Sequence, residues 1–127
     1  MPILVTKGVE IKVVTSFSVR DSDIMGEQFV FRYTVRITNR NSFAIKLLKR
    51  RWQIFDSLGM MNIVHGDGVI GQNPIIEPGA SYEYSSWSRI KSEIGEMQGA
   101  YLMEKDSGDT FWVDIPIFEL IYPGKLN

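Results

Sequence analysis

The sequence of 127 residues predicts an all-β fold, a sandwich or a barrel of short antiparallel strands. Apolar and polar residues alternate with a period of two through much of the chain, as in strands that are buried on one face. Segments rich in Gly, Asn, Asp and Pro separate these runs. Only residues 88–97 approach a helical period, and Gly95 interrupts them, so a single turn or a loop is expected there.

The first two strands are expected at residues 9–20 and 28–38. In the first, every second residue from Val9 onward forms one mainly apolar face. The second has the cleanest alternation in the chain, and its apolar series is Phe29, Phe31, Tyr33, Val35 and Ile37. Asp21-Ser22-Asp23 and Gly26 are expected to form the turn between the two strands. Residues 1–8 are expected to form a loose arm.

A third strand is expected at residues 44–56. Its alternation slips at Leu47 and Leu48, where two apolar residues follow one another. One extra residue in a strand changes the face that every later side chain occupies. We therefore interpret the slip as a β-bulge.

The second half of the chain predicts shorter strands. They are expected at residues 61–65, 75–76, 81–89, 97–105 and 111–121. The strand at 81–89 is rich in serine and aromatic residues, and its alternation places Tyr82 and Tyr84 on one face and Trp87 on the other. The turn residues 106–109 connect the last two strands.

The composition fits one domain and limits the classes of protein. A chain of 14.5 kDa buries about two-thirds of its unfolded surface, which is enough for an apolar core. The absence of cysteine excludes disulfides and thiolate metal sites. A net charge of −1 gives no reason to expect nucleic acid or an anionic membrane as a partner. No apolar run reaches the length of a signal peptide or a membrane span, so a cytoplasmic protein is expected.

Several short motifs resemble the signature of the ApaG family. They are Arg51-Trp52, GDGVIG at residues 66–71, Pro74, Pro78-Gly79, GEMQGAY at residues 95–101 and IPIF at residues 115–118. The resemblance covers residues 9–123 as a single domain. It implies a two-sheet antiparallel β-sandwich, like that of fibronectin type III and immunoglobulin domains, in a bacterial protein. The family has no settled activity, and its name is associated with tolerance to cobalt and magnesium.

The glycine segment, residues 66–71, has the G-x-G-x-x-G spacing of dinucleotide-binding loops. In those loops a helix follows, and its N-terminal amides and dipole hold the pyrophosphate. Here Gln72-Asn73-Pro74 follows, so no helix has room to start. We interpret the glycines as positions for positive φ angles and bulges. The alternative is a ligand site made by Gly66, Asp67, Gly68 and Gly71.

Candidate residues for metal binding and catalysis are few. Imidazole suits cobalt and carboxylate oxygen suits magnesium, so His65 and Asp67 form half of a divalent-metal site. A solvated or structural His65 is the preferred interpretation, and no cofactor is expected. The chain has one histidine, and residues 81–88 contain no nucleophile elbow. No catalytic residue is assigned, and an enzyme is not expected.

The candidate partner-binding residues are Arg50, Arg51, Tyr84 and Trp87. Strict alternation sends Lys46 and Arg50 to one face of their strand and Lys49 and Arg51 to the other, unless the bulge changes this. Cations divided between two faces do not form the continuous basic surface that a nucleic-acid backbone would bind. One of the two rings, Tyr84 or Trp87, is expected at the surface, where exposed aromatic residues are hot-spot candidates.

Two hypotheses of function follow from the sequence. The preferred one is a non-catalytic module that binds a still unidentified protein partner, as a monomer or a weak homodimer. The resemblance supports it, because similar ApaG domains are appended to F-box proteins and to a polymerase-delta-interacting protein. The alternative is a small-ligand binder, for a nucleotide pyrophosphate or a divalent metal, at the glycine segment. The two differ in whether the amides of that segment point into an open concavity.

Overall fold

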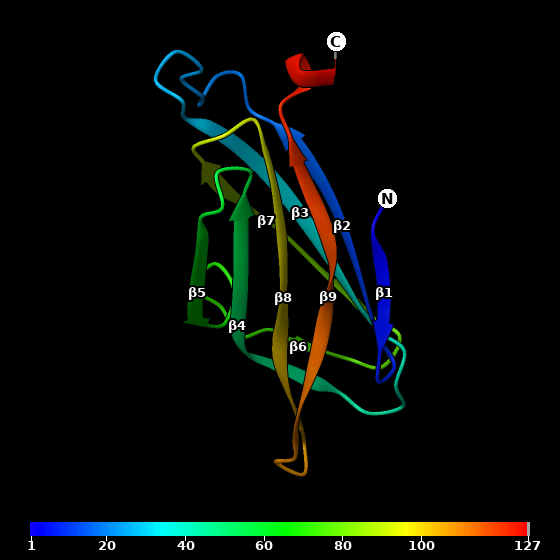
Figure 1. Ribbon diagram of the computed structural model, residues 1–127. Helices are drawn as coiled ribbons and strands as arrows, with labels where there is room; N and C mark the ends of the chain where they lie inside the picture. The colour runs from blue at the N-terminus through cyan, green and yellow to red at the C-terminus, as the bar shows by residue number, and fades with distance from the viewer. Residues whose placement is uncertain (127) are drawn as a thin grey trace.

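The computed structural model describes residues 1–126 and confirms the two-sheet antiparallel β-sandwich (Figure 1). The elements are β1 (Ile3–Thr6), β2 (Val9–Phe17), β3 (Phe29–Asn39), β4 (Ile45–Asp56), β5 (Met61–Asp67), β6 (Ile75–Ile76), β7 (Ser81–Ile90), β8 (Ile94–Lys105), β9 (Thr110–Ile121) and the 3₁₀ helix η1 (Pro123–Leu126). The first sheet has the order β1-β2-β3-β7. The second has the order β5-β4-β8-β9, and β6 also pairs with β4. The described residues contain no α-helix.

The N-terminal residues form strand β1, so the expectation of a loose arm at residues 1–8 was wrong. Lys7 and Gly8 have φ angles of 49° and 76°. Two consecutive positive φ angles are typical of the type I′ turn, whose twist matches that of a hairpin. Thr6 then pairs with Val9 across the turn. The sequence carried the signal as a run of mostly β-branched residues, 3–6, followed by Lys-Gly.

The first sheet follows the predicted alternation. The alternating apolar series of β3 is buried in the core between the sheets: Phe29, Phe31, Tyr33, Val35 and Ile37. Strand β2 ends at Phe17 rather than at residue 20, because a turn closed by the Ser18 hydroxyl follows it. Residues 91–93 form a short turn between β7 and β8, as expected for a segment without helical periodicity.

Strand β4 contains the predicted bulge. Its pairing with β8 shifts register between Leu47 and Lys49, so Leu48 is the extra residue. Before the bulge, the odd-numbered Ile45 and Leu47 point into the core. After it, the even-numbered Trp52 does so. The bulge therefore exchanges the two faces of β4.

The loop after β5 is hydrogen-bonded to this bulge. The amide of Gly68 donates to the carbonyl of Leu48 at 2.8 Å, and the amide of Leu47 donates to the carbonyl of Pro74 at 3.0 Å. Asn73 Nδ2 donates to the carbonyls of Leu47 and Leu48 at 3.0 and 3.1 Å. The loop thus satisfies backbone groups that the bulge removes from the regular ladder.

Aromatic side chains fill the centre of the core. The Trp52 ring makes edge-to-face contacts with Tyr33, Tyr101 and Phe118, at centroid distances of 5.4, 6.3 and 5.8 Å. Tyr84 and Tyr101 share a hydrogen bond between their hydroxyl groups, one from each sheet. Burial raises the pKa of the phenols of Tyr33, Tyr84 and Tyr101 above the ordinary value of 10.0, because the phenolate is poorly solvated there.

We expect the free energy of unfolding to fall as the pH rises above about 10. In the unfolded chain the three phenols lose their protons near that pH, whereas the folded chain retains them because their pKa is raised. The stabilisation is therefore complete below pH 10 and is lost above it. Urea titrations across this range measure the effect. Tyr101→Phe is expected to reduce the slope with pH, and Tyr82→Phe, at a partly exposed tyrosine, is the control. A slope unchanged in Tyr101→Phe would contradict this origin.

Candidate functional site

The glycine segment is folded against the sandwich. Arg50 Nη1 donates to the carbonyls of Asp67 and Gly68 at 3.1 and 3.0 Å. Val69 and Gln72 exchange two backbone hydrogen bonds, at 2.8 and 2.9 Å, and the side chain of Val69 is fully buried in the core. The amides of Gly68 and Val69 are therefore already donors to protein carbonyls.

The spacing of the glycines has a structural explanation. Ile70 and Gly71 have φ angles of 44° and 76°, so residues 69–72 form a tight turn with two positive φ angles. Gly68 has a φ angle of 60° and is packed so closely that a Cβ atom would collide with the carbonyl of Gln72. Gly68 and Gly71 thus match the interpretation of the glycines as positions for positive φ, whereas Gly66 has no positive φ angle. An anion nest needs neighbouring amides that are free to donate, and those of Gly68 and Val69 are not. Ligand binding by Gly66, Asp67, Gly68 and Gly71 stays a prediction.

His65 and Asp67 lie on the same exposed face of β5. In the register with β4, His65 stands opposite Arg51 and Asp67 stands opposite Lys49. A cation at either residue would therefore lie next to a positive side chain. No group of three His, Cys, Asp or Glu residues that could hold a metal ion occurs among residues 1–126. His65 and Asp67 thus gain no further ligand from the fold.

The bulge corrects the assignment of the basic cluster. Because the faces exchange at Leu48, Lys46, Lys49 and Arg51 all lie on the exposed outer face of the second sheet. Arg50 lies alone on the inner side, half-buried beneath the glycine segment. Its Nη1 is engaged by the loop, and partner binding by Arg50 stays a prediction.

The two aromatic candidates of β7, Tyr84 and Trp87, lie on opposite faces of the strand, as the alternation predicted. Tyr84 is 5% exposed and bonded to Tyr101, so its assignment to a partner-binding surface was wrong. Trp87 is 54% exposed on the outer face of the first sheet. The guanidinium carbon of Arg32 lies 5.9 Å from the centre of the Trp87 ring, and the same side chain donates to the Ser85 hydroxyl at 3.3 Å.

The outer face of the first sheet is predominantly cationic around Trp87. On β2, β3 and β7 it carries Lys12, Arg32, Arg36 and Arg89 against the carboxylates of Glu10 and Glu83. Glu10 already pairs with Arg40, and Glu83 stands opposite Arg36. Arg32 and Arg89 flank Trp87 on this face. We call the surface made by Arg32, Trp87 and Arg89 the Trp87 face.

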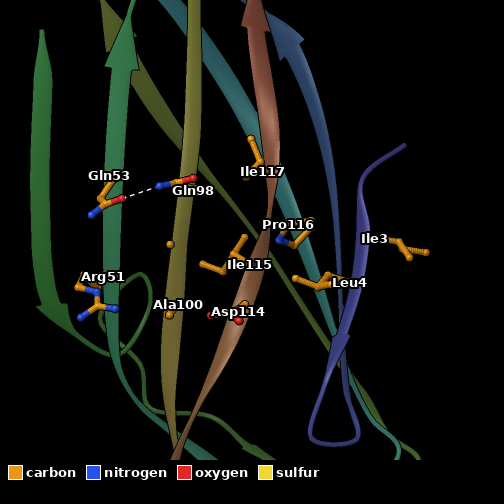
Figure 2. A pocket seen from close by; sticks show the side chains of 11 residues that line it. Ile3, Leu4, Arg51, Gln53, Gln98, Ala100, Asp114, Ile115, Pro116 and Ile117 are labelled. Atoms are coloured by element: carbon orange, nitrogen blue, oxygen red, sulfur yellow. Dashed lines mark hydrogen bonds between the residues drawn. The ribbon is translucent and has the colours of Figure 1, made fainter.

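A groove of about 520 Å³ lies on the outer face of the second sheet (Figure 2). Its walls come from four strands, with Ile3 and Leu4 on β1, Arg51 and Gln53 on β4, residues 98–100 on β8 and residues 114–117 on β9. Sequence reasoning missed this groove, because one wall is the unexpected strand β1. The other walls depend on the register between strands, for which a single sequence gives little signal.

No helix within residues 1–126 is long and apolar enough to cross a membrane.

A family model described as the ApaG domain matches residues 19–105. The chain is 42% identical to Protein ApaG of Anaeromyxobacter dehalogenans (strain 2CP-1) over 127 residues, which is all of both chains. It is 41% identical to Protein ApaG of Pseudomonas putida (strain W619) over 119 residues, or 94% of each chain.

Two solved structures are similar in both sequence and fold. One is the X-ray structure of a structural-genomics target with 33% identity and a TM-score of 0.89, over 98% of this chain and 94% of that chain. The other is the crystal structure of an ApaA protein from Bordetella pertussis, with 35% identity and a TM-score of 0.87 over 96% of each chain. The architecture of two packed β-sheets is therefore shared with experimentally solved relatives.

We expect Gly68→Ala to destabilise the fold more than Gly71→Ala does. Both residues have positive φ angles, but only the Cβ at Gly68 meets backbone, whereas nothing lies within 4 Å of a Cβ at Gly71. The strained φ alone costs about 1–2 kcal/mol, and the collision at Gly68 adds to this. Chemical denaturation of both variants measures the difference. Equal losses would refute the close packing, and an unchanged midpoint with loss of pyrophosphate binding would favour a ligand site.

Proposed function

The chain belongs to the ApaG family, and from this premise we propose that it is a non-catalytic module that binds a protein partner through the Trp87 face. The observation that carries the proposal is the exposed indole of Trp87 between two arginines. Tryptophan and arginine are the residues most enriched in binding hot spots. An indole left in water on a sheet also offers a large apolar area that a partner can bury.

The Trp87 face is held in one arrangement before any partner binds. Arg32 lies over the indole ring, and a hydroxyl pair joins β3 to β7 nearby, Thr34 to Ser85 at 2.8 Å. Such a surface loses little side-chain entropy when it is covered. In the part of the chain that the structure describes, β7 pairs only with β3, so its other edge can also accept a strand from the partner.

The charge of the Trp87 face favours an acidic partner surface. Arg32 and Arg89 have no carboxylate opposite them in the register, since their cross-strand neighbours include Trp87 and Val30. Carboxylates of a partner would complement these arginines and accelerate the encounter. The proposal places the module in the bacterial cytoplasm, as a monomer or a weak homodimer. A contribution to cobalt or magnesium tolerance would then act through the bound protein.

Trp87→Ala is expected to leave the unfolding midpoint nearly unchanged and to reduce partner capture. The ring packs on the surface rather than in the core, so its truncation leaves no cavity. Tyr84→Ala, which truncates a buried ring, is expected to cost about 3–5 kcal/mol. The measurement is cross-linking in cells followed by quantitative mass spectrometry of proteins bound to the wild type and to Trp87→Ala.

Ile75→Ala, which truncates an exposed residue outside this face, is the matched control for capture. It is expected to capture the same proteins as the wild type. Captured proteins should also dissociate as the salt concentration rises, because the arginines are exposed. The same set of proteins on Trp87→Ala as on the wild type would reject the Trp87 face as the docking surface.

A further inference from the structure

Arg51 differs from the other cations on the outer face of β4. Lys46 stands opposite Glu104 on β8, and Lys49 stands opposite Asp67 on β5. Arg51, in contrast, has His65 and Ala100 as its cross-strand neighbours. The Arg51 guanidinium has no hydrogen bond or ion pair to any residue within 1–126. Its positive charge is therefore not complemented by a neighbouring carboxylate.

The Arg51 guanidinium is nevertheless held in a defined position. Its central carbon lies 4.9 Å from the centre of the Trp112 ring, within the range of a cation–π contact. A planar guanidinium that rests on a ring keeps its N–H donors at the edge, where they can receive a carboxylate in bidentate fashion. Figure 2 shows Arg51 at the β4 side of the groove, across Ala100 from Asp114.

An amide pair lies beside Arg51 in the groove. Gln98 Nε2 donates to Gln53 Oε1 at 2.6 Å (Figure 2). This bond leaves the Gln53 amide nitrogen as a donor and the Gln98 amide oxygen as an acceptor. A peptide unit has one carbonyl and one N–H, so the pair offers a matching partner for each.

The far side of the groove is apolar. Ile3 and Ile117 are 52% and 54% exposed, and Leu4 and Pro116 lie beside them. Pro116 has no N–H, and the Asp114 amide already donates to Thr6 Oγ1 at 3.3 Å. Strand addition to β9 is therefore hindered here, and a ligand would contact side chains instead.

We propose that this groove binds an extended acidic segment of a protein partner, with Arg51 receiving a carboxylate and the Ile3–Ile117 wall receiving an apolar side chain. The site lies on the sheet opposite to the Trp87 face and goes beyond the function proposed above. Strands β4 and β9 are two strand spacings apart, which is about 10 Å. An extended segment advances about 3.3 Å per residue, and its side chains alternate between its two faces. An acidic and an apolar side chain that both face the groove are therefore expected two or four positions apart.

Asp114 is the one carboxylate among the groove-lining residues. Arg51 on β4, Ala100 on β8 and Asp114 on β9 stand opposite one another in a single cross-strand row. Neither Arg51 nor the Asp114 carboxylate has an ion-pair partner among residues 1–126. Of the two charges, only that of Arg51 is held on an aromatic ring, the indole of Trp112. Arg51 is therefore the pre-organised charge of the groove, and it favours a carboxylate in the ligand.

The test is a selection of randomised displayed peptides, each of about eight residues, on the immobilised full chain. Peptides that combine Asp or Glu with an apolar residue two or four positions away are expected to be enriched. Fluorescence polarisation of an enriched peptide is then measured with variants. Arg51→Ala is expected to weaken binding by about tenfold or more. Arg51→Lys is expected to weaken it by less, since lysine keeps the charge but lacks the planar pair of N–H donors that binds a carboxylate in bidentate fashion.

Two matched variants separate this site from other surfaces. Lys49→Ala removes a neighbouring cation on the same face, and Trp87→Ala disrupts the face proposed for the module's main partner. Both are expected to retain peptide binding, and Ile117→Asp is expected to lose it. Circular dichroism and unfolding midpoints identify any variant that fails to fold.

Several results would overturn the proposal. They are the absence of enriched peptides, enrichment of basic peptides that depend on Asp114, or equal binding by wild type and Arg51→Ala. Self-association of the free chain that Ile117→Asp abolishes would show instead that a second copy occupies the groove. Loss of binding in Trp87→Ala with retention in Arg51→Ala would place the acidic segment on the Trp87 face.

Discussion

The hydrogen bonds between the β4 bulge and the loop at residues 68–74 are the constraint on which the rest of the structure depends. The bulge inserts Leu48 and exchanges the faces of β4, so Trp52 enters the core while Arg51 is turned to the outer surface. An extra strand residue leaves backbone groups without ladder partners, and these would be costly inside a sandwich. Gly68, Asn73 and Pro74 supply the partners. The positions of Arg50 beneath the loop and of Arg51 in the groove both follow from this arrangement.

The same constraint explains a motif that has the spacing of a nucleotide-binding loop. Two glycines of the segment at 66–71 are required by backbone conformation, because Gly68 packs against the carbonyl of Gln72 and Gly71 completes a turn with two positive φ angles. Gly66 has no positive φ angle, and a Cβ there would meet the Arg50 guanidinium. In dinucleotide-binding folds the same spacing frees amides at the start of a helix. Here the amides of Gly68 and Val69 donate to the chain itself. Identical spacing thus serves two different backbone requirements, and the element that follows distinguishes them.

The sequence predicted those features that depend on local alternation. It placed β2, β3 and β4, the bulge at Leu47–Leu48, and Tyr84 and Trp87 on opposite faces, because side chains alternate with a period of two in any strand. It did not determine which ring is buried, since this depends on which face the other sheet covers. It included Arg50 and Tyr84 among the candidate partner-binding residues, although Arg50 lies beneath the loop and Tyr84 bonds Tyr101 across the sheets. The groove could not be predicted from the sequence. Its walls come together only through the register between strands and through the unexpected hairpin at Lys7-Gly8.

The most direct test of this account is the hydrogen exchange of the Gly68 amide, measured by NMR in the wild type and in Asn73→Ala. If the loop is fixed to the bulge, the Gly68 amide opens only together with β4, and its protection in the wild type is expected to approach that of the core strand. Removing the two bonds from Asn73 is expected to speed exchange at Gly68 while Asn62→Ala, a change on exposed β5, leaves it unaltered. Exchange of the wild-type Gly68 amide at the rate of an unstructured loop would contradict the account.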